Sequence, residues 1–158
     1  PVTFLLASFY WENFIQGMGP RKGPDGKLAI TMPMGDKKLP GIAVEDIGNC
    51  AYAVFKRGGE FVGKRVGIAG EHLTGHEMAA ALSKALGKEI VYNDVPPEVY
   101  RKLGFPGAED LGNMFQFYRD FAEDFCAARS VEFTRSLNPS LLTFSTWLEK
   151  NKSRIPLE

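Results

Sequence analysis

The hydrophobic positions of the chain form a continuous run at its start and periodic patterns further on. Residues 2–8 read VTFLLAS, and such a run is typical of a strand that is covered on both faces and paired on both edges. Residues 44–56 carry apolar side chains three and four positions apart, which predicts an amphipathic helix. Its expected buried face contains Ile47, Cys50, Ala51, Val54 and Phe55.

Strand and helix patterns alternate through the middle of the chain. Residues 64–70 and 88–95 have the composition of strands. The segment between them predicts a helix, because Thr74 and Glu77 form a capping-box pattern and Gly87 is a typical stop signal. Residues 96–104 predict a short helix with proline in its first turn. The alternation favours an α/β fold with parallel strand pairing.

Glycines and prolines divide the segment between the first strand and the first long helix. Residues 10–18 predict a short helix that ends at its glycines. The sequence PDG is typical of a tight turn, so we expect a hairpin of short extended segments near residues 24–44. Pro33 and Pro40 favour the edges of a sheet, because proline cannot donate a backbone hydrogen bond.

The last third of the chain has a different pattern. Residues 108–128 predict one long helix, residues 130–138 an extended segment and residues 140–151 an amphipathic helix. We expect residues 108–158 to form a small helical lobe on the edge of the sheet, on the side of a substrate or partner. The aromatic stripe of the long helix has three interpretations that its periodicity does not separate: core packing, a ligand cavity or a partner surface. The stripe consists of Leu111, Met114, Phe115, Tyr118, Phe121, Ala122 and Phe125.

Composition narrows the class of protein. The 158 residues are 44% hydrophobic, enough for one globular domain with a core. Nineteen basic residues balance nineteen acidic ones without long runs of one sign, so we expect neither direct nucleic-acid binding nor a charged tail. Cys50 and Cys126 stand outside any C-x-x-C pair, which fits a reducing compartment. The apolar runs are too short for a bilayer, and we expect a soluble intracellular protein.

Three motifs suggest chemistry that their context does not support. His72 and His76 have the spacing of two zinc ligands, but the capping box places His72 before the helix, so we expect no metal site. Tyr52 and Lys56 match the Y-x-x-x-K pair of short-chain dehydrogenases, but they lie beyond the first strand and are expected to be surface residues. The glycines of 67–75 lack the G-x-G-x-x-G spacing and are expected to form turns.

Residues 9–14 read FYWENF and place an acid and an amide where the first strand should lead into a helix. One interpretation is that Glu12 and Asn13 satisfy the amides at the start of that helix. Open α/β sheets bind ligands at the carboxyl ends of their strands, so ligand contact is the second interpretation.

Long stretches of the chain resemble the NmrA-like family, an atypical branch of the short-chain dehydrogenases. The segments that carry the resemblance are FYWENFI, GIAVEDIGNCAYAVF and, most specifically, LGFPGAEDLGNMFQFY. They are most similar to the animal branch of NmrA-like redox sensors. Family members are extended Rossmann proteins about twice this length, so the chain looks like their C-terminal half. The resemblance implies that residues 1–107 are the last strands and helices of the NAD(P)-binding domain and that 108–158 are the C-terminal lobe.

The resemblance also implies a ligand and a site. The family segment YFEN contacts the nicotinamide end of the cofactor and corresponds to Tyr10, Trp11, Glu12 and Asn13, with tryptophan in place of phenylalanine. NADP(H) is the implied cofactor, and most of its contacts are expected from sequence before Pro1. No catalytic residue is implied, because the family's redox sensors lack a working Tyr–Lys pair.

Three functions follow from these observations. The first is an NADP(H)-binding redox sensor that acts through protein partners or its own dimer, in the cytoplasm and also in the nucleus. The second is an NADPH-dependent reductase of the quinone or isoflavone reductase type, which needs a proton donor beside the nicotinamide. The third is an interaction module that binds its partner without any cofactor.

Overall fold

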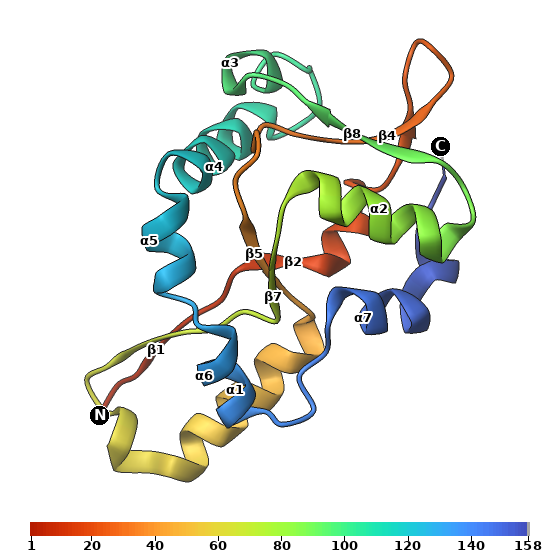
Figure 1. Cartoon of the computed structure of the whole chain (residues 1–158). Helices are drawn as coiled ribbons and strands as arrows, with labels where there is room; N and C mark the ends of the chain where they lie inside the picture. The colour runs from red at the N-terminus through yellow and green to blue at the C-terminus, as the bar shows by residue number, and fades with distance from the viewer. Residues whose placement is uncertain (158) are drawn as a thin grey trace.

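The computed structural model describes residues 1–157, and Figure 1 shows short strands surrounded by helices. The strands are β1 (Phe4–Leu6), β2 (Phe9–Tyr10), β3 (Arg21–Lys22), β4 (Leu28–Met32), β5 (Leu39–Ile42), β6 (Arg65–Gly67), β7 (Glu71–Leu73) and β8 (Ile90–Asp94). The α-helices are α1 (Val44–Arg57), α2 (Gly75–Leu86), α3 (Pro97–Tyr100), α4 (Ala108–Asp120), α5 (Ala122–Ala127), α6 (Val131–Leu137) and α7 (Phe144–Asn151). Three short 3-10 helices, η1 (Trp11–Phe14), η2 (Gly58–Phe61) and η3 (Lys152–Arg154), complete the secondary structure of the described residues.

The strands form three small sheets with a parallel pair in each. β1 pairs with β6, β5 lies between β2 and β7, and β4 lies between β3 and β8. The pairs β1–β6, β2–β5 and β4–β8 are parallel, whereas β3–β4 and β5–β7 are antiparallel. The predicted α/β class and the parallel pairing are therefore confirmed.

The first strand is less covered than its sequence predicts. Among residues 1–157, β1 pairs only with β6, and the side chains of Val2, Phe4 and Leu6 are exposed. The neighbours that such a strand needs on its second face and its second edge are therefore not found among the described residues. Alternate residues of a strand point to opposite faces, and here only the face of Leu5 packs against neighbours.

The helix predicted at 44–56 is present as α1, with one exception on its apolar face. Cys50 and Val54 are buried in the smaller of two hydrophobic clusters, and Ile47 packs against that cluster. Phe55 is 83% exposed, contrary to prediction. Burial follows the side that faces β6 and α6, and Phe55 lies one position past Val54 on the helix, where no described residue covers it.

The predicted hairpin is shorter than expected. β3 and β4 form it around Asp25 and Gly26, and Gly26 takes the left-handed conformation with φ of 78°. β5 belongs to another sheet, and Pro40 lies in its central strand rather than at an edge. This position is tolerated because β2 pairs with β5 only at Gly41 and Ile42, so the missing N–H of Pro40 breaks no bond to β2.

Three further elements differ from the sequence predictions. The segment before α2 contains a strand, β7, that the sequence did not predict. Residues 130–138 are mostly helical rather than extended, because the Ser130 side chain accepts a hydrogen bond from the Phe133 N–H at 3.2 Å and starts α6. The long helix is broken at Phe121, whose φ of −116° and ψ of 30° are not helical.

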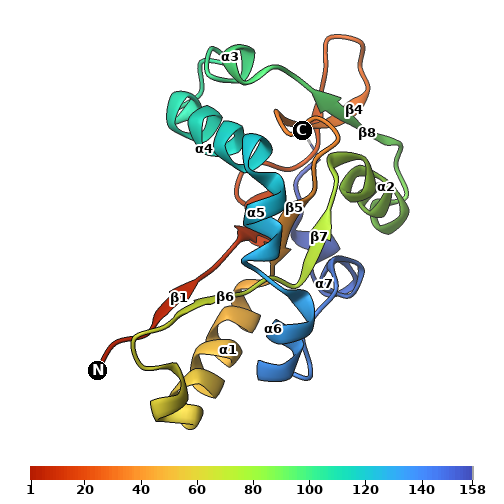
Figure 2. The ribbon, with the colours of Figure 1, turned by 60° about the vertical axis from the view of Figure 1, so that its left-hand side comes forward.

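The core joins both ends of the chain. The larger hydrophobic cluster includes Trp11 and Phe14 from the start, together with Phe144, Trp147 and Leu148 from α7. The predicted helices of 108–158 are present, but they do not gather in one lobe: α4 packs against α3, α5 against β5, α6 against α1 and α7 against α2 (Figures 1 and 2). Each of these four helices thus packs on an element of residues 1–107, and the boundary expected at residue 107 stays a prediction.

Candidate functional site

The residues Tyr10 to Asn13 lie where β1 and β2 end and the short helix η1 begins. Tyr10 is the last residue of β2 and pairs with Ile42 of β5. β1 is parallel to β6, and β2 is parallel to β5, so this point is a carboxyl end of parallel strands. Ligands of open α/β sheets bind at such ends. Burial sets Trp11 apart from the other three residues, and hydrogen bonds set Glu12 apart from Tyr10 and Asn13.

Trp11 lies inside the protein. Its side chain is 1% exposed, and its ring centroid lies 5.4 Å from that of Phe144 and 6.2 Å from that of Trp147. These separations are typical of favourable aromatic pairs. The tryptophan therefore joins the start of the chain to α7 from within the core.

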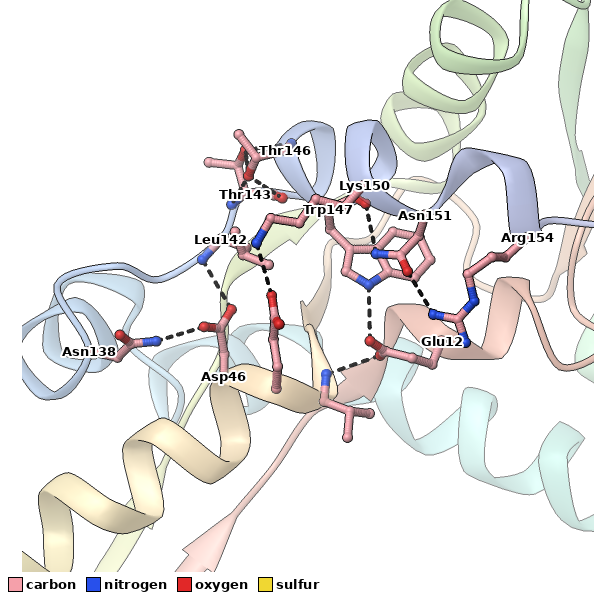
Figure 3. A network of polar contacts seen from close by, with 12 residues as sticks. Glu12, Asp46, Asn138, Leu142, Thr143, Thr146, Trp147, Lys150, Asn151 and Arg154 are labelled. Carbon is pink, nitrogen blue, oxygen red and sulfur yellow. Dashed lines mark hydrogen bonds and ion pairs between the residues drawn. The ribbon is translucent and has the colours of Figure 1, made fainter.

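Glu12 links three elements through its carboxylate, as Figure 3 shows. Oε1 accepts a hydrogen bond from Trp147 Nε1 at 2.9 Å, and Oε2 accepts one from the backbone N–H of Val44 at 3.1 Å. Val44 is the first residue of α1, so the carboxylate accepts a hydrogen bond from a free amide at a helix N-terminus. Its negative charge also interacts favourably with the positive end of the helix dipole. The sequence suggested this capping for the following short helix, but the carboxylate caps α1.

A second carboxylate, that of the buried Asp46, lies beside this link (Figure 3). Asp46 accepts hydrogen bonds from Asn138 Nδ2 at 2.6 Å and from the Leu142 N–H at 3.0 Å. Burial raises the pKa of Asp46, although both hydrogen bonds act in the opposite direction. Together Glu12 and Asp46 fix the start of α1 against α7 and the loop before it.

Tyr10 and Asn13 remain as candidates for ligand contact. Tyr10 is 43% exposed. Asn13 is half-buried and enters the hydrogen bonds found among residues 1–157 only through its main-chain carbonyl, which accepts from Gln16 and Met18. The side chains of Tyr10 and Asn13 thus make no hydrogen bond within the described part of the chain, whereas those of Trp11 and Glu12 are held by the contacts given above.

The end of α5 approaches the same strand end and contributes a residue that the sequence did not predict. Arg129 donates from Nε to the Ala7 carbonyl at 3.0 Å. Its guanidinium lies 3.6 Å from the ring centroid of Phe125. Burial raises the pKa of Tyr118, whose ring centroid lies 4.4 Å from that of Phe125. A single arginine between two helices has no sequence pattern by which it could be found.

The aromatic stripe is divided between core and surface. Phe115 is buried, Tyr118 and Phe125 are half-buried, and Phe121 is exposed. Phe117, outside the predicted stripe, is also exposed, and its ring centroid lies 5.1 Å from that of Phe121. The break after α4 turns these rings away from one continuous face.

The motifs set aside in the sequence have other roles in the structure. Tyr52 is exposed on α1, with Lys56 Nζ 5.6 Å from the centroid of its ring. His72 Nε2 donates to the Arg129 carbonyl at 2.8 Å, and the His76 ring meets Tyr92 edge-on at 5.0 Å. Gly75 is the first residue of α2, and a Cβ there would collide with the Tyr92 ring.

Neither a metal cluster nor a membrane-spanning helix occurs in the described part of the chain. Across residues 1–157, no three His, Cys, Asp or Glu side chains are grouped so that they could hold a metal ion. In the same part of the chain, no helix is long and apolar enough to cross a membrane.

Comparisons with other proteins place the chain among larger ones. A profile of the NmrA-like family matches residues 1–149. The chain is 29% identical over 142 residues to prestalk A differentiation protein A of Dictyostelium discoideum, which covers 84% of this chain and 46% of that protein. It is 32% identical over 113 residues to the nitrogen metabolite repression protein nmrA of Emericella nidulans, which covers 67% of this chain and 32% of that protein. The chain thus spans about half the length of these curated relatives, or less.

A third relative and two solved structures agree with this placement. Over 56 residues, 35% of this chain and 31% of the relative, it is 41% identical to NmrA-like family domain-containing protein 1 of Rattus norvegicus. NmrA, a negative transcriptional regulator in complex with NADP, matches with a TM-score of 0.72 at 22% identity, over 95% of this chain and 52% of that one. The Citrobacter sp. triphenylmethane reductase complexed with NADP(H) matches with a TM-score of 0.70 at 17% identity, over 94% and 53%. At these identities the structures establish a shared fold, and the profile match establishes that the chain belongs to the NmrA-like family.

Proposed function

We propose that this chain forms the nicotinamide side of an NADP(H)-binding site in a redox-sensing regulator, and that it is the C-terminal half of that protein. The observation that carries the proposal is the exposed Tyr10 beside the free Asn13 amide, at the carboxyl end of β1 and β2. In a Rossmann-type sheet this is the edge at which a dinucleotide lies. The NADP complex of the structurally similar NmrA supports the choice of cofactor.

The phosphate-binding half of the cofactor site is expected outside these residues. The 158 residues contain no G-x-G-x-x-G loop, and the chain spans about half of its relatives. We therefore expect the isolated chain to bind NADPH weakly or not at all. Calorimetry measures this directly, and sub-micromolar affinity of the isolated chain would contradict the division of the site.

A regulatory role fits the site better than a catalytic one. The exposure of Tyr52 and Lys56 on the surface of α1 supports a protein without a working Tyr–Lys pair. A reductase remains the second candidate because the phenol of Tyr10, exposed at the end of β2, would serve as a proton donor. The observation that favours the third candidate, a cofactor-independent interaction module, is the exposed pair of rings of Phe117 and Phe121.

One experiment separates the three functions. The full-length gene product is titrated with NADPH, its association state is measured by sedimentation with NADPH and with NADP+, and NADPH oxidation is followed with a quinone. A redox sensor binds NADPH, changes its association with itself or with a protein partner between the two redox forms, and oxidises NADPH only slowly. Rapid, quinone-dependent oxidation would establish the reductase, and a partner bound without any nucleotide effect would establish the interaction module. The sensor is expected in the cytoplasm and nucleus, which imaging of the tagged gene product tests.

A further inference from the structure

A hollow of about 480 Å³ lies beside the β3–β4 hairpin, and we call it the hairpin hollow. Its lining comes from the loop after η1, from both strands of the hairpin, from α3 and from the start of α4. The residues that matter below are Arg21, Ala29, Thr31, Tyr100, Phe105 and Leu111. The residues Tyr10 to Asn13 are not part of the lining, so the hollow is separate from the proposed nicotinamide site. Its volume is that of a small-molecule pocket.

One face of the hairpin forms the floor of this hollow. Arg21 pairs with Ala29 across the two strands, and Thr31 follows two positions later on the same face. Ile30 and Met32 point to the opposite face of β4, where they are buried in the core cluster that includes α2 (Figure 1). A long side chain reaches its diagonal neighbour on the next strand. Arg21 and Thr31 therefore flank the small Ala29 on one surface.

The floor carries a positive charge and no acidic neighbour. The ion pairs found among residues 1–157 join side chains other than Arg21, and no aspartate or glutamate of that part of the chain lines the hollow. The guanidinium lies along the loop after η1, since its Nη2 is 3.9 Å from the position of a Cβ at Gly17. The Thr31 hydroxyl accepts a hydrogen bond from Asn93 Nδ2 at 3.2 Å and keeps its own hydrogen for a further acceptor.

The wall of the hollow carries a buried phenol without a hydrogen-bond partner. Tyr100 is 3% exposed, and its ring meets those of Phe105 and Phe115 edge-on at 5.6 Å and 5.5 Å. Burial raises the pKa of Tyr100, and no hydrogen bond within residues 1–157 acts on its phenol. In contrast, the half-buried Tyr92 phenol takes part in three hydrogen bonds.

The phenol of Tyr100 opens onto the hollow. Among residues 1–157, only the Ser8 hydroxyl is fully enclosed without a partner, so the Tyr100 oxygen reaches a surface, and this residue lines the hollow. The hydroxyl of a buried tyrosine usually has a partner. A ligand in the hollow would supply the partner that the described chain does not.

Apolar side chains complete the wall. Leu103 is 47% exposed, and Phe105 and Leu111 are half-buried. An apolar group that covers them is removed from water together with them, which favours binding. The hollow thus combines an apolar wall with a few hydrogen-bond donors and one cation, a combination typical of small-molecule pockets.

We propose that the hairpin hollow binds a small organic acid with an apolar body, at a site separate from the cofactor. The two oxygens of a carboxylate offer about four acceptor positions. The planar fork of Arg21 would fill two of them, and the hydroxyls of Thr31 and Tyr100 would fill the others. The apolar body would lie against Leu103 and Phe105. This inference goes beyond the proposed function, because no residue of the nicotinamide site takes part in it.

The test compares 4-phenylbutyrate with its amide, which has nearly the same shape and no charge. Binding to the full-length gene product is measured by saturation-transfer NMR, without nucleotide and again with NADPH. We expect the acid to bind about threefold to tenfold more tightly than the amide, with the same affinity in both conditions. Arg21→Gln should bring the two ligands to equal affinity. The matched control Lys22→Gln removes the next positive charge, which lies on the opposite face of the hairpin, and should leave the preference unchanged.

A second variant tests the wall of the hollow. Tyr100→Phe keeps the ring between Phe105 and Phe115 and removes an oxygen that bonds to no described residue, so the fold should be retained. We expect it to weaken binding of the acid about threefold to tenfold, because one hydrogen bond to the carboxylate is lost.

Three results would overturn the proposal: equal affinities of acid and amide for the unmodified protein, acid binding that neither substitution weakens, and displacement of the acid by NADPH. The last would place the acid in the cofactor site. Failure of NADPH to bind would contradict the proposed function alone, because the preference for the acid is also measured without nucleotide.

Discussion

The two hydrophobic clusters of the chain are made of similar residues but differ in how completely they are covered. The larger one lies between η1, α2 and α7 and encloses Trp11, Phe14, Phe144 and Trp147 almost fully. The smaller one lies between β1, β6, α1 and α6, and exposed apolar side chains border it. A hollow of about 270 Å³ on that side is lined by Val2, Leu5, Val54, Phe55 and Val62, among others.

In both clusters, an apolar side chain of the sequence pattern is buried only where another element packs against it. The larger cluster draws its residues from both ends of the sequence, so each apolar face meets another. On the smaller side, the strand that should be covered twice is covered once. The larger cluster is thus covered by residues of this chain, whereas the smaller one leaves apolar surface exposed.

The largest expected effect comes from emptying the closed cluster. Trp147→Ala removes an indole that stacks at 5.9 Å on Phe144 and donates to Glu12. We expect a loss of about 3–5 kcal/mol in the free energy of unfolding, measured by urea denaturation. Trp147→Phe keeps a ring and should cost less. If Trp147→Ala lowered the free energy of unfolding no more than a substitution at an exposed residue does, this cluster would not be the core of the protein.

Overfilling the same cluster should cost less. A Cβ at Gly41 would lie against the indole nitrogen of Trp11, so Gly41→Ala should destabilise the protein by about 1–3 kcal/mol. Gly48→Ala is the matched control, because nothing lies near its Cβ position in α1. That control should stabilise the helix by up to about 1 kcal/mol. Equal effects of the two substitutions would show that the packing around Trp11 is loose.

The buried carboxylate between the two clusters should make stability depend on pH. Because the pKa of Asp46 is raised above its usual 3.8, the native state keeps this proton at pH values where the unfolded chain has released it. This contribution to stability is therefore full below pH 3.8 and is lost as the pH rises through the native pKa. Urea denaturation at a series of pH values should show that Asp46→Asn removes this slope. Glu60→Gln, at an exposed carboxylate whose charge does not contribute to the shift of Asp46, should keep it.

The smallest effect on stability is expected on the open side. Phe55→Ser should change the free energy of unfolding by less than about 0.5 kcal/mol, because the ring is exposed. It should nevertheless reduce binding of an apolar dye to this surface. Phe61→Ser, at a buried ring of the same cluster, should destabilise the protein strongly. A large loss of stability from Phe55→Ser would mean that the two sides are equally closed.

Local signals predicted much of the fold, and long-range contacts explain what they missed. The Thr74–Glu77 capping box and the Gly87 stop of α2 depend on neighbouring residues, and both are present. The exposure of Phe55 and the central position of Pro40 depend on which elements pack together, which periodicity does not contain. The helix at 131–137 was missed because its cap, Ser130, lies among residues that also suit a strand.

The candidate site shows the same limit. The sequence was sufficient to place the segment from Tyr10 to Asn13 at a strand end. It did not show that other elements hold the side chains of Trp11 and Glu12 and leave those of Tyr10 and Asn13 free. Trp11 and Glu12 are held by α7 and α1, which lie far along the chain. Arg129 reaches the strand end through a contact with Ala7 across most of the sequence.

In the proposed function, the nicotinamide of NADP(H) lies at the strand end formed by Tyr10 and Asn13. Calorimetric titration of the full-length gene product with NADPH tests it most directly, with Asn13→Ala as the variant and Asn151→Ala, whose side chain donates to the Trp147 carbonyl in α7, as the control. We expect Asn13→Ala to raise the dissociation constant for NADPH about tenfold, as for one lost hydrogen bond, and the control to leave it unchanged. An unchanged dissociation constant for Asn13→Ala would contradict the claim and return Asn13 to a purely structural role.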